Sequence, residues 1–192
     1  MNPNAATLRL AVWPRTGVLA DLLLVAAGAA FVAGSAQVTI ERWPVPITGQ
    51  TFGVLLVGAS LGSARGLASV GLYVLVGLLG APIYQDQHHG IDYFLGPTGG
   101  YLIGFVVAAT LVGYLAEQRW DRRLSSAVAA MLTGNVVVYA IGLPWLAAEL
   151  DAGFTETLEA GLYPFVVGDL LKLYLAGALL PTAWALVERA RR

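Results

Sequence analysis

An acid and a base inside an apolar run near the end of the chain are the residues best suited to chemistry. Asp169 and Lys172 are three positions apart, so in a helix both side chains lie on one face and can form an ion pair. Lys172 is also the only lysine in the chain. Each charge costs about 2.5–3.5 kcal/mol near the bilayer centre, so the pair must face protein or a cavity. We expect it to bind a polar ligand, to relay protons in a proton-coupled carrier, or only to hold helices together.

A second candidate is the glycine-rich segment 95–105. Pro97 suits a first helical turn, and Gly99 and Gly100 allow close backbone approach beside Tyr101. The N–H groups and dipole at such a helix start can hold an anion or a carbonyl oxygen. Helix packing is the alternative, because Gly100 and Gly104 form a small-residue face.

The third candidate is a loop stiffened by Pro44 and Pro46. Thr48 and Gln50 follow it and can exchange hydrogen bonds with a polar ligand. Capping of the next helix by Thr48 is the alternative, and both roles are compatible.

Two other patterns carry no function. Residues 58–62 match G-x-S-x-G, and His88, His89 and Asp92 complete a hydrolase triad on paper. That motif requires a strand–turn–helix context, whereas Ser60 falls inside an apolar span and the histidines in a loop. Adjacent histidines also lack metal-ligand helical spacing, so no metal site is predicted.

Composition places the chain in a membrane. Hydrophobic residues make up 57% of the 192 positions and charged residues 12%, about half the share in a soluble domain. The net charge of −1 provides no basic surface for nucleic acid, and the absence of cysteine removes disulfides and thiolate chemistry. The sequence predicts an integral membrane protein.

Apolar segments predict an all-α fold with six transmembrane helices, because about 20 apolar residues cross a bilayer. We expect a single membrane domain, 1–192, with spans at about 17–38, 50–64, 66–82, 98–117, 124–148 and 164–188. The second and third are short and separated only by residues 64–66, which predicts a tight hairpin.

Arginines orient these spans. With six spans, all but Arg42 fall on one face, which the positive-inside rule makes cytoplasmic. These are Arg9, Arg15, Arg65, Arg119, Arg122, Arg123, Arg189, Arg191 and Arg192. Both termini are therefore predicted to be cytoplasmic, with longer acidic loops outside.

Small residues line the first span. Ala26 and Ala30 lie one turn apart, as do Ala29 and Ala33, which makes a smooth face for close helix contact. Its partner is either another helix of this chain or a second subunit.

Three motifs in this order on six apolar spans resemble the BioY family, the biotin-binding S components of energy-coupling-factor (ECF) transporters. They are residues 44–52, residues 95–101, and the Gly168-Asp169-Leu170-Leu171-Lys172 run. The resemblance implies a six-helix subunit, not an enzyme, that captures biotin outside a prokaryotic cell membrane without a cofactor. It also implies a transmembrane coupling subunit and two cytoplasmic ATPases as partners. The chain has no Walker motif of its own, so any ATP dependence must come from such partners.

The resemblance further implies which residues bind. For biotin these are Asp169, Lys172, Tyr101, Gly99, Gly100, Gln50, Thr48 and His88. For docking on the coupling subunit they are Ala26 and Ala30. The departure is loop 84–93, where similar proteins have a glycine-rich loop often containing asparagine, and where His88 stands near that position.

Overall fold

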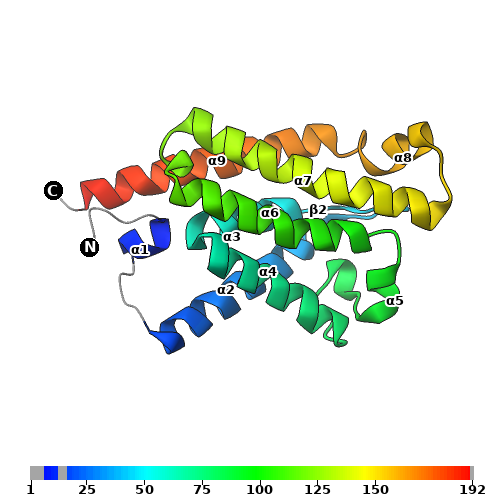
Figure 1. The fold of residues 1–192 in the computed structure, drawn as a ribbon, viewed down its shortest axis with the longest axis horizontal. Coiled ribbons are helices and arrows are strands. Elements are labelled where there is room, and N and C mark those ends of the chain that lie inside the picture. The colour runs from blue at the N-terminus through cyan, green and yellow to red at the C-terminus, as the bar shows by residue number, and fades with distance from the viewer. Residues whose placement is uncertain (1–6, 13–16, 191–192) are drawn as a thin grey trace.

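The computed structural model describes residues 7–12 and 17–190 and is almost entirely helical. Its long helices run side by side along one axis (Figure 1). They are α2 (Val18–Ala36), α3 (Gln50–Leu61), α4 (Ser63–Leu78), α6 (Gly99–Glu117), α7 (Leu124–Leu150) and α9 (Val166–Arg189). Shorter elements are α1 (Leu8–Val12), η1 (Gln85–Gln87), α5 (Gly90–Leu95), η2 (Trp120–Arg122), α8 (Phe154–Gly161), and strands β1 (Thr39–Ile40) and β2 (Ile47–Thr48).

Four helices, α2, α6, α7 and α9, are long and apolar enough to cross a membrane. Helices α3 and α4 have 12 and 16 residues. At 1.5 Å per residue they reach only about 18 and 24 Å, less than a hydrocarbon core of about 30 Å. Length and composition therefore support four of the six expected spans directly.

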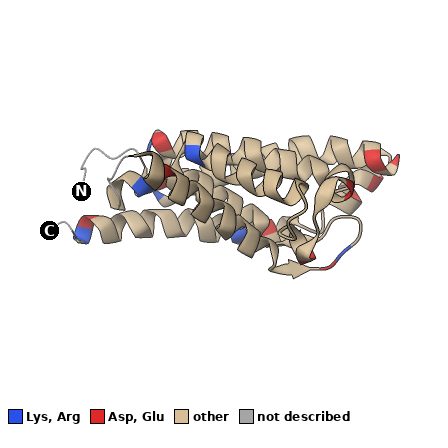
Figure 2. Cartoon of the chain, turned by 90° about the horizontal axis from the view of Figure 1, so that it is seen from below, with Lys and Arg blue, Asp and Glu red and all other residues tan. Residues whose placement is uncertain are grey.

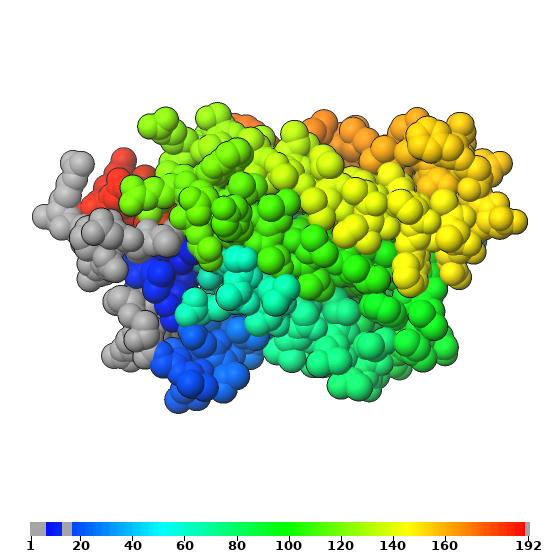
Figure 3. Space-filling view, in the orientation of Figure 1, coloured from blue at the N-terminus to red at the C-terminus, as the bar shows by residue number. Residues whose placement is uncertain are grey.

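Helix α6 is the centre of the bundle. It packs against α3, α4 and α7, while α9 packs on α7 and α3, and α2 packs on α4 and α3. Of the four long helices, α6 has the largest buried share and α2 the smallest. The residues of α2 form the lower left edge in the space-filling view (Figure 3).

The connection between α3 and α4 differs from the predicted hairpin at 64–66. It consists of Gly62 alone, whose φ of +88° is readily available to glycine. Gly66 lies inside α4 and serves packing instead, since a Cβ there would meet Gly58 Cα at 3.0 Å. The predicted turn was wrong by a few residues, because Gly62 and Gly66 can each make a turn. Only the contacts of Gly66 with α3 and α6 show that Gly66 serves packing and Gly62 makes the turn.

The two ends of the bundle differ. Helix α1 and the last turn of α9 lie at one end, and α5 and α8 lie at the other (Figure 1). Lys and Arg gather toward the first end, whereas the far end carries mainly Asp and Glu (Figure 2). The connections at the far end include short elements, among them an antiparallel β1–β2 pair with Thr39 opposite Thr48.

We expect Gly58→Ala to destabilise the bundle, because the new Cβ would lie 2.5 Å from the carbonyl oxygen of Ala109 on α6. Overpacking of this kind costs about 1–3 kcal/mol. The measurement is the midpoint of thermal unfolding in detergent. The matched control is Gly71→Ala on α4, where nothing lies within 4 Å and alanine favours the helix by up to about 1 kcal/mol. A Gly58→Ala midpoint at or above the control value would contradict close α3–α6 packing.

Candidate ligand-binding site

A cavity lies between the β1–β2 connection and helices α3, α6, α7 and α9. Its walls combine apolar and aromatic side chains with a few polar groups, as such sites usually do. The lining residues are Val45, Pro46, Thr48, Gln50, Thr51, Tyr93, Thr98, Tyr101, Leu102, Phe105, Asn135, Val138, Tyr139, Phe165, Asp169 and Lys172.

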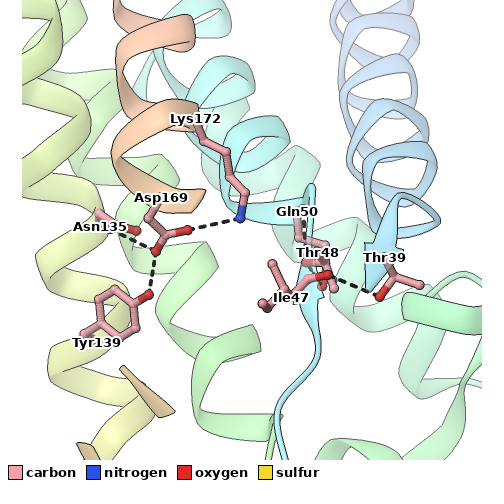
Figure 4. Close-up of polar contacts among 8 residues, drawn as sticks. All are labelled: Thr39, Ile47, Thr48, Gln50, Asn135, Tyr139, Asp169 and Lys172. Atoms are coloured by element: carbon pink, nitrogen blue, oxygen red, sulfur yellow. Dashed lines mark hydrogen bonds and ion pairs between the residues drawn. The ribbon is translucent and has the colours of Figure 1, made fainter. Parts of the chain in front are cut away.

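Asp169 sits in the first turn of α9 and is only 4% exposed. Its Oδ1 accepts a hydrogen bond from Lys172 Nζ at 3.0 Å. Its Oδ2 accepts from Asn135 Nδ2 at 3.2 Å and from the Tyr139 hydroxyl, both on α7 (Figure 4). The predicted pair therefore exists, and it is part of a polar cluster that joins α9 to α7.

Lys172 extends from α9 toward the side of the cavity where Thr48 and Gln50 lie (Figure 4). Its side chain is 18% exposed. An ammonium has three N–H donors, and the structure records one side-chain bond, to Asp169. Lys172 can therefore donate to a ligand oxygen while it remains paired with the carboxylate.

Asn135 is a site residue that the sequence reasoning missed. It is buried in α7, and its Oδ1 has no hydrogen-bond partner among the described residues. A buried acceptor without a partner costs about 1–3 kcal/mol, so a ligand N–H that reaches it would gain that energy back. Asn135 and Tyr139 are four residues apart inside a predicted span, and that spacing of polar groups was the available signal.

Thr48 and Gln50 line the opposite wall and are already bonded within the protein. Gln50 Nε2 donates to the Tyr73 hydroxyl at 2.6 Å, and Gln50 Oε1 accepts from Thr48 Oγ1 at 2.9 Å. Thr48 Oγ1 also accepts from the backbone N–H of Gln50 at the start of α3. The N-cap of α3 is Gly49, which has no side-chain cap bond, so capping by Thr48 was wrong: Thr48 lies one residue before the cap, and its hydroxyl bonds the first helical N–H.

Aromatic residues form much of the remaining wall. Tyr101 donates its hydroxyl to the carbonyl oxygen of Gly161 at 2.9 Å and meets Tyr139 edge to face at 6.2 Å. Tyr93 projects from α5, outside the long helices, and burial raises the pKa of its phenol. A phenol is already neutral at physiological pH, and this shift moves its ionisation further from that range.

Three predicted binding residues lie off the cavity wall. A Cβ on Gly99 would come within 1.9 Å of Phe94 O, and one on Gly100 within 2.3 Å of Trp145 Cβ, so both glycines allow close packing at the start of α6. His88 stacks on Tyr93 at 4.9 Å and borders a separate polar pocket near the β1–β2 connection. Their contact with a ligand stays a prediction.

The alanine face of α2 is divided between two roles. Ala29 is buried against the bundle, whereas Ala26 and Ala30 are exposed on the outer side of the helix. Packing within the chain therefore uses one side of the small-residue surface and leaves the predicted docking pair uncovered.

Comparison with known proteins identifies this architecture. The sequence model of the BioY family matches residues 4–189. A biotin transporter BioY from Rhizobium etli is 34% identical over 169 residues, covering 83% of this chain and 90% of the relative. A probable biotin transporter BioY from Pyrococcus horikoshii is 38% identical over 152 residues, covering 79% and 88%.

A solved structure supports the same assignment. The crystal structure of the S component for biotin from an ECF-type ABC transporter superimposes with a TM-score of 0.75 and 27% identity, covering 85% of this chain and 90% of that one. Together with its long apolar helices, these matches show that the chain is a multi-pass membrane protein and belongs to the BioY family.

Proposed function

We propose that this chain is the biotin-binding S component of an ECF transporter and captures biotin for uptake. The observation that carries the proposal is the buried cluster of Asp169, Lys172, Asn135 and Tyr139 at one wall of an otherwise apolar cavity. Relatives named biotin transporters, and the biotin S component with the same fold, supply the ligand.

The chemistry of biotin suits this wall. Its ureido ring offers two N–H donors and one strongly accepting oxygen, and its fused ring is largely apolar. The unpartnered Oδ1 of Asn135 and a carboxylate oxygen of Asp169 accept the two N–H groups, and Lys172 donates to the ureido oxygen. Leu102, Phe105 and other apolar side chains contact the fused ring. Tyr101, Thr48 and Gln50 complete the walls, and Gly99, Gly100 and His88 contribute at the outer end.

The chain crosses a prokaryotic plasma membrane six times, with both termini in the cytoplasm. The concentration of arginines at the end that holds α1 and the end of α9 supports this orientation (Figure 2). Helices α3 and α4 complete the six crossings despite their length. Both helices pack closely on α6, which supports their place in the bundle.

Energy for transport comes from partners. A transmembrane coupling subunit and two cytoplasmic ATPases would supply it, since the sequence has no nucleotide-binding lysine motif. The uncovered Ala26 and Ala30 face of α2 supports a docking role there, because small residues let another helix approach closely.

Labelled biotin should bind saturably to the purified subunit in detergent, and Lys172→Met should weaken binding at least tenfold. The substitution removes a donor to the ligand and leaves the buried carboxylate of Asp169 without its charged partner. Asp169→Asn should weaken binding as well. Glu156→Gln, on the exposed surface of α8, is the control and should bind normally. Lack of saturable binding by the wild type would refute the proposed function, whereas normal binding by both site variants would refute only the assigned site.

Asn135→Leu should weaken biotin binding roughly 5- to 100-fold, because a hydrogen bond to a buried partner is worth about 1–3 kcal/mol. The two side chains are similar in size. Thr133→Val on the exposed side of the same helix is the control, since its hydroxyl bonds only the Ala129 carbonyl. Isothermal titration of the three proteins gives the comparison. Equal affinities for Asn135→Leu and Thr133→Val would show that Oδ1 does not contact the ligand.

The double variant Ala26→Leu/Ala30→Leu should bind biotin normally but fail to co-purify with the coupling subunit and ATPases. Two added isobutyl groups prevent close helix approach. The matched control is Ala64→Leu/Ala68→Leu, an exposed pair at the same spacing on α4. Co-purification of the α2 variant at the level of the control would place the docking surface elsewhere.

A further inference from the structure

A polar cleft lies at the end of the bundle opposite the ligand cavity. It is formed by η2, the start of α7 and the last turns of α9. In the space-filling view the yellow-green residues that follow α6 meet the red end of α9 at the upper left (Figure 3). None of its lining residues belongs to the ligand cavity.

Three arginines within five positions line this cleft. Arg119 and Arg123 are exposed, and within residues 7–12 and 17–190 no carboxylate lies within 4 Å of either guanidinium. Arg122 lies 3.8 Å from Asp121 and stacks over the Trp184 ring with 3.4 Å between its Cζ and the ring centroid. The cleft therefore holds one oriented guanidinium and two that form no ion pair within 4 Å among the described residues.

The frame of this cleft is rigid. Asp121 is 1% exposed and accepts a hydrogen bond from Trp184 Nε1, which ties η2 to α9. Ser126 stabilises the connection between η2 and α7, because its hydroxyl donates to the carbonyl oxygens of Trp120 and Arg123. The backbone that carries the arginines is therefore held in place without any ligand.

Trp120 indicates where the cleft lies relative to the membrane. It is 40% exposed, and exposed tryptophans of membrane proteins favour the headgroup region. Arginines prefer phosphate because the planar guanidinium matches two phosphate oxygens. Basic pockets between transmembrane helices at the cytoplasmic surface are typical binding places for anionic headgroups.

We propose that this cleft binds the phosphodiester headgroup of an anionic phospholipid. Arg119 and Arg123 contact the phosphate, Arg122 adds charge from its fixed position on Trp184, and the acyl chains lie along the apolar outside of α7 and α9. Glu188 also lines the cleft, where its carboxylate can accept from headgroup hydroxyls. A hydroxylated monoanionic headgroup such as phosphatidylglycerol therefore fits best. The bound lipid would link the α6–α7 connection to the end of α9.

Native mass spectrometry of the full chain with phosphatidylglycerol or phosphatidylcholine tests the proposal. We expect wild type to retain phosphatidylglycerol preferentially. Arg119→Gln/Arg123→Gln should bind it roughly 30-fold more weakly, from the contribution typical of two such arginines. Arg42→Gln, an exposed arginine at the other end, is the matched control and should bind like wild type. Biotin binding by each variant confirms that the variant is folded. If the double variant does not fold, Arg119→Gln or Arg123→Gln alone replaces it, with a smaller expected loss of lipid binding.

A second arm separates a lipid site from a site for a soluble anion. Phosphatidylglycerol should raise the thermal midpoint of wild type more than that of the double variant, and inorganic phosphate or glycerophosphate at the same concentration should not. Stabilisation by the soluble anions alone would overturn the lipid assignment. Equal retention of both lipids, or an equal loss in Arg42→Gln, would overturn the site.

Discussion

The buried carboxylate of Asp169 sets the geometry of this protein. An ionisable group at that depth is costly unless it is paired and hydrogen-bonded, and here Lys172, Asn135 and Tyr139 donate to it. Two of these donors come from α7, so α7 and α9 must pack side by side at a defined register. The same requirement places the polar groups together at one wall of the cavity.

Close helix contact elsewhere makes this arrangement possible. Gly58 and Gly66 bring α3 and α4 against α6, and Gly100 lets α6 approach Trp145 of α7. The short helices are thereby held inside the bundle, where neighbouring helices rather than lipid cover much of their surface. The cavity lies where these helices meet the β1–β2 connection, and aromatic side chains form part of its wall.

The three roles considered for the Asp169 and Lys172 pair make different demands on its surroundings. A purely structural pair needs no adjoining cavity and no orphan acceptor, yet the site has a cavity and Asn135 Oδ1 has no partner in the described chain. The pair joins two helices and borders a cavity. Holding helices and binding a ligand are therefore compatible uses of one cluster, and family membership favours the second.

The sequence by itself determined the membrane environment, the apolar segments, and the ion pair of Asp169 and Lys172, because hydrophobicity and i,i+3 spacing are local properties. It also indicated the family, through three ordered motifs. Only the tertiary structure decided that Gly62 makes the α3–α4 turn, that Gly99 and Gly100 serve packing, and that Asn135 and Tyr139 join the site. Those assignments depend on which helix faces which, and that is fixed by side-chain packing between segments distant in the chain.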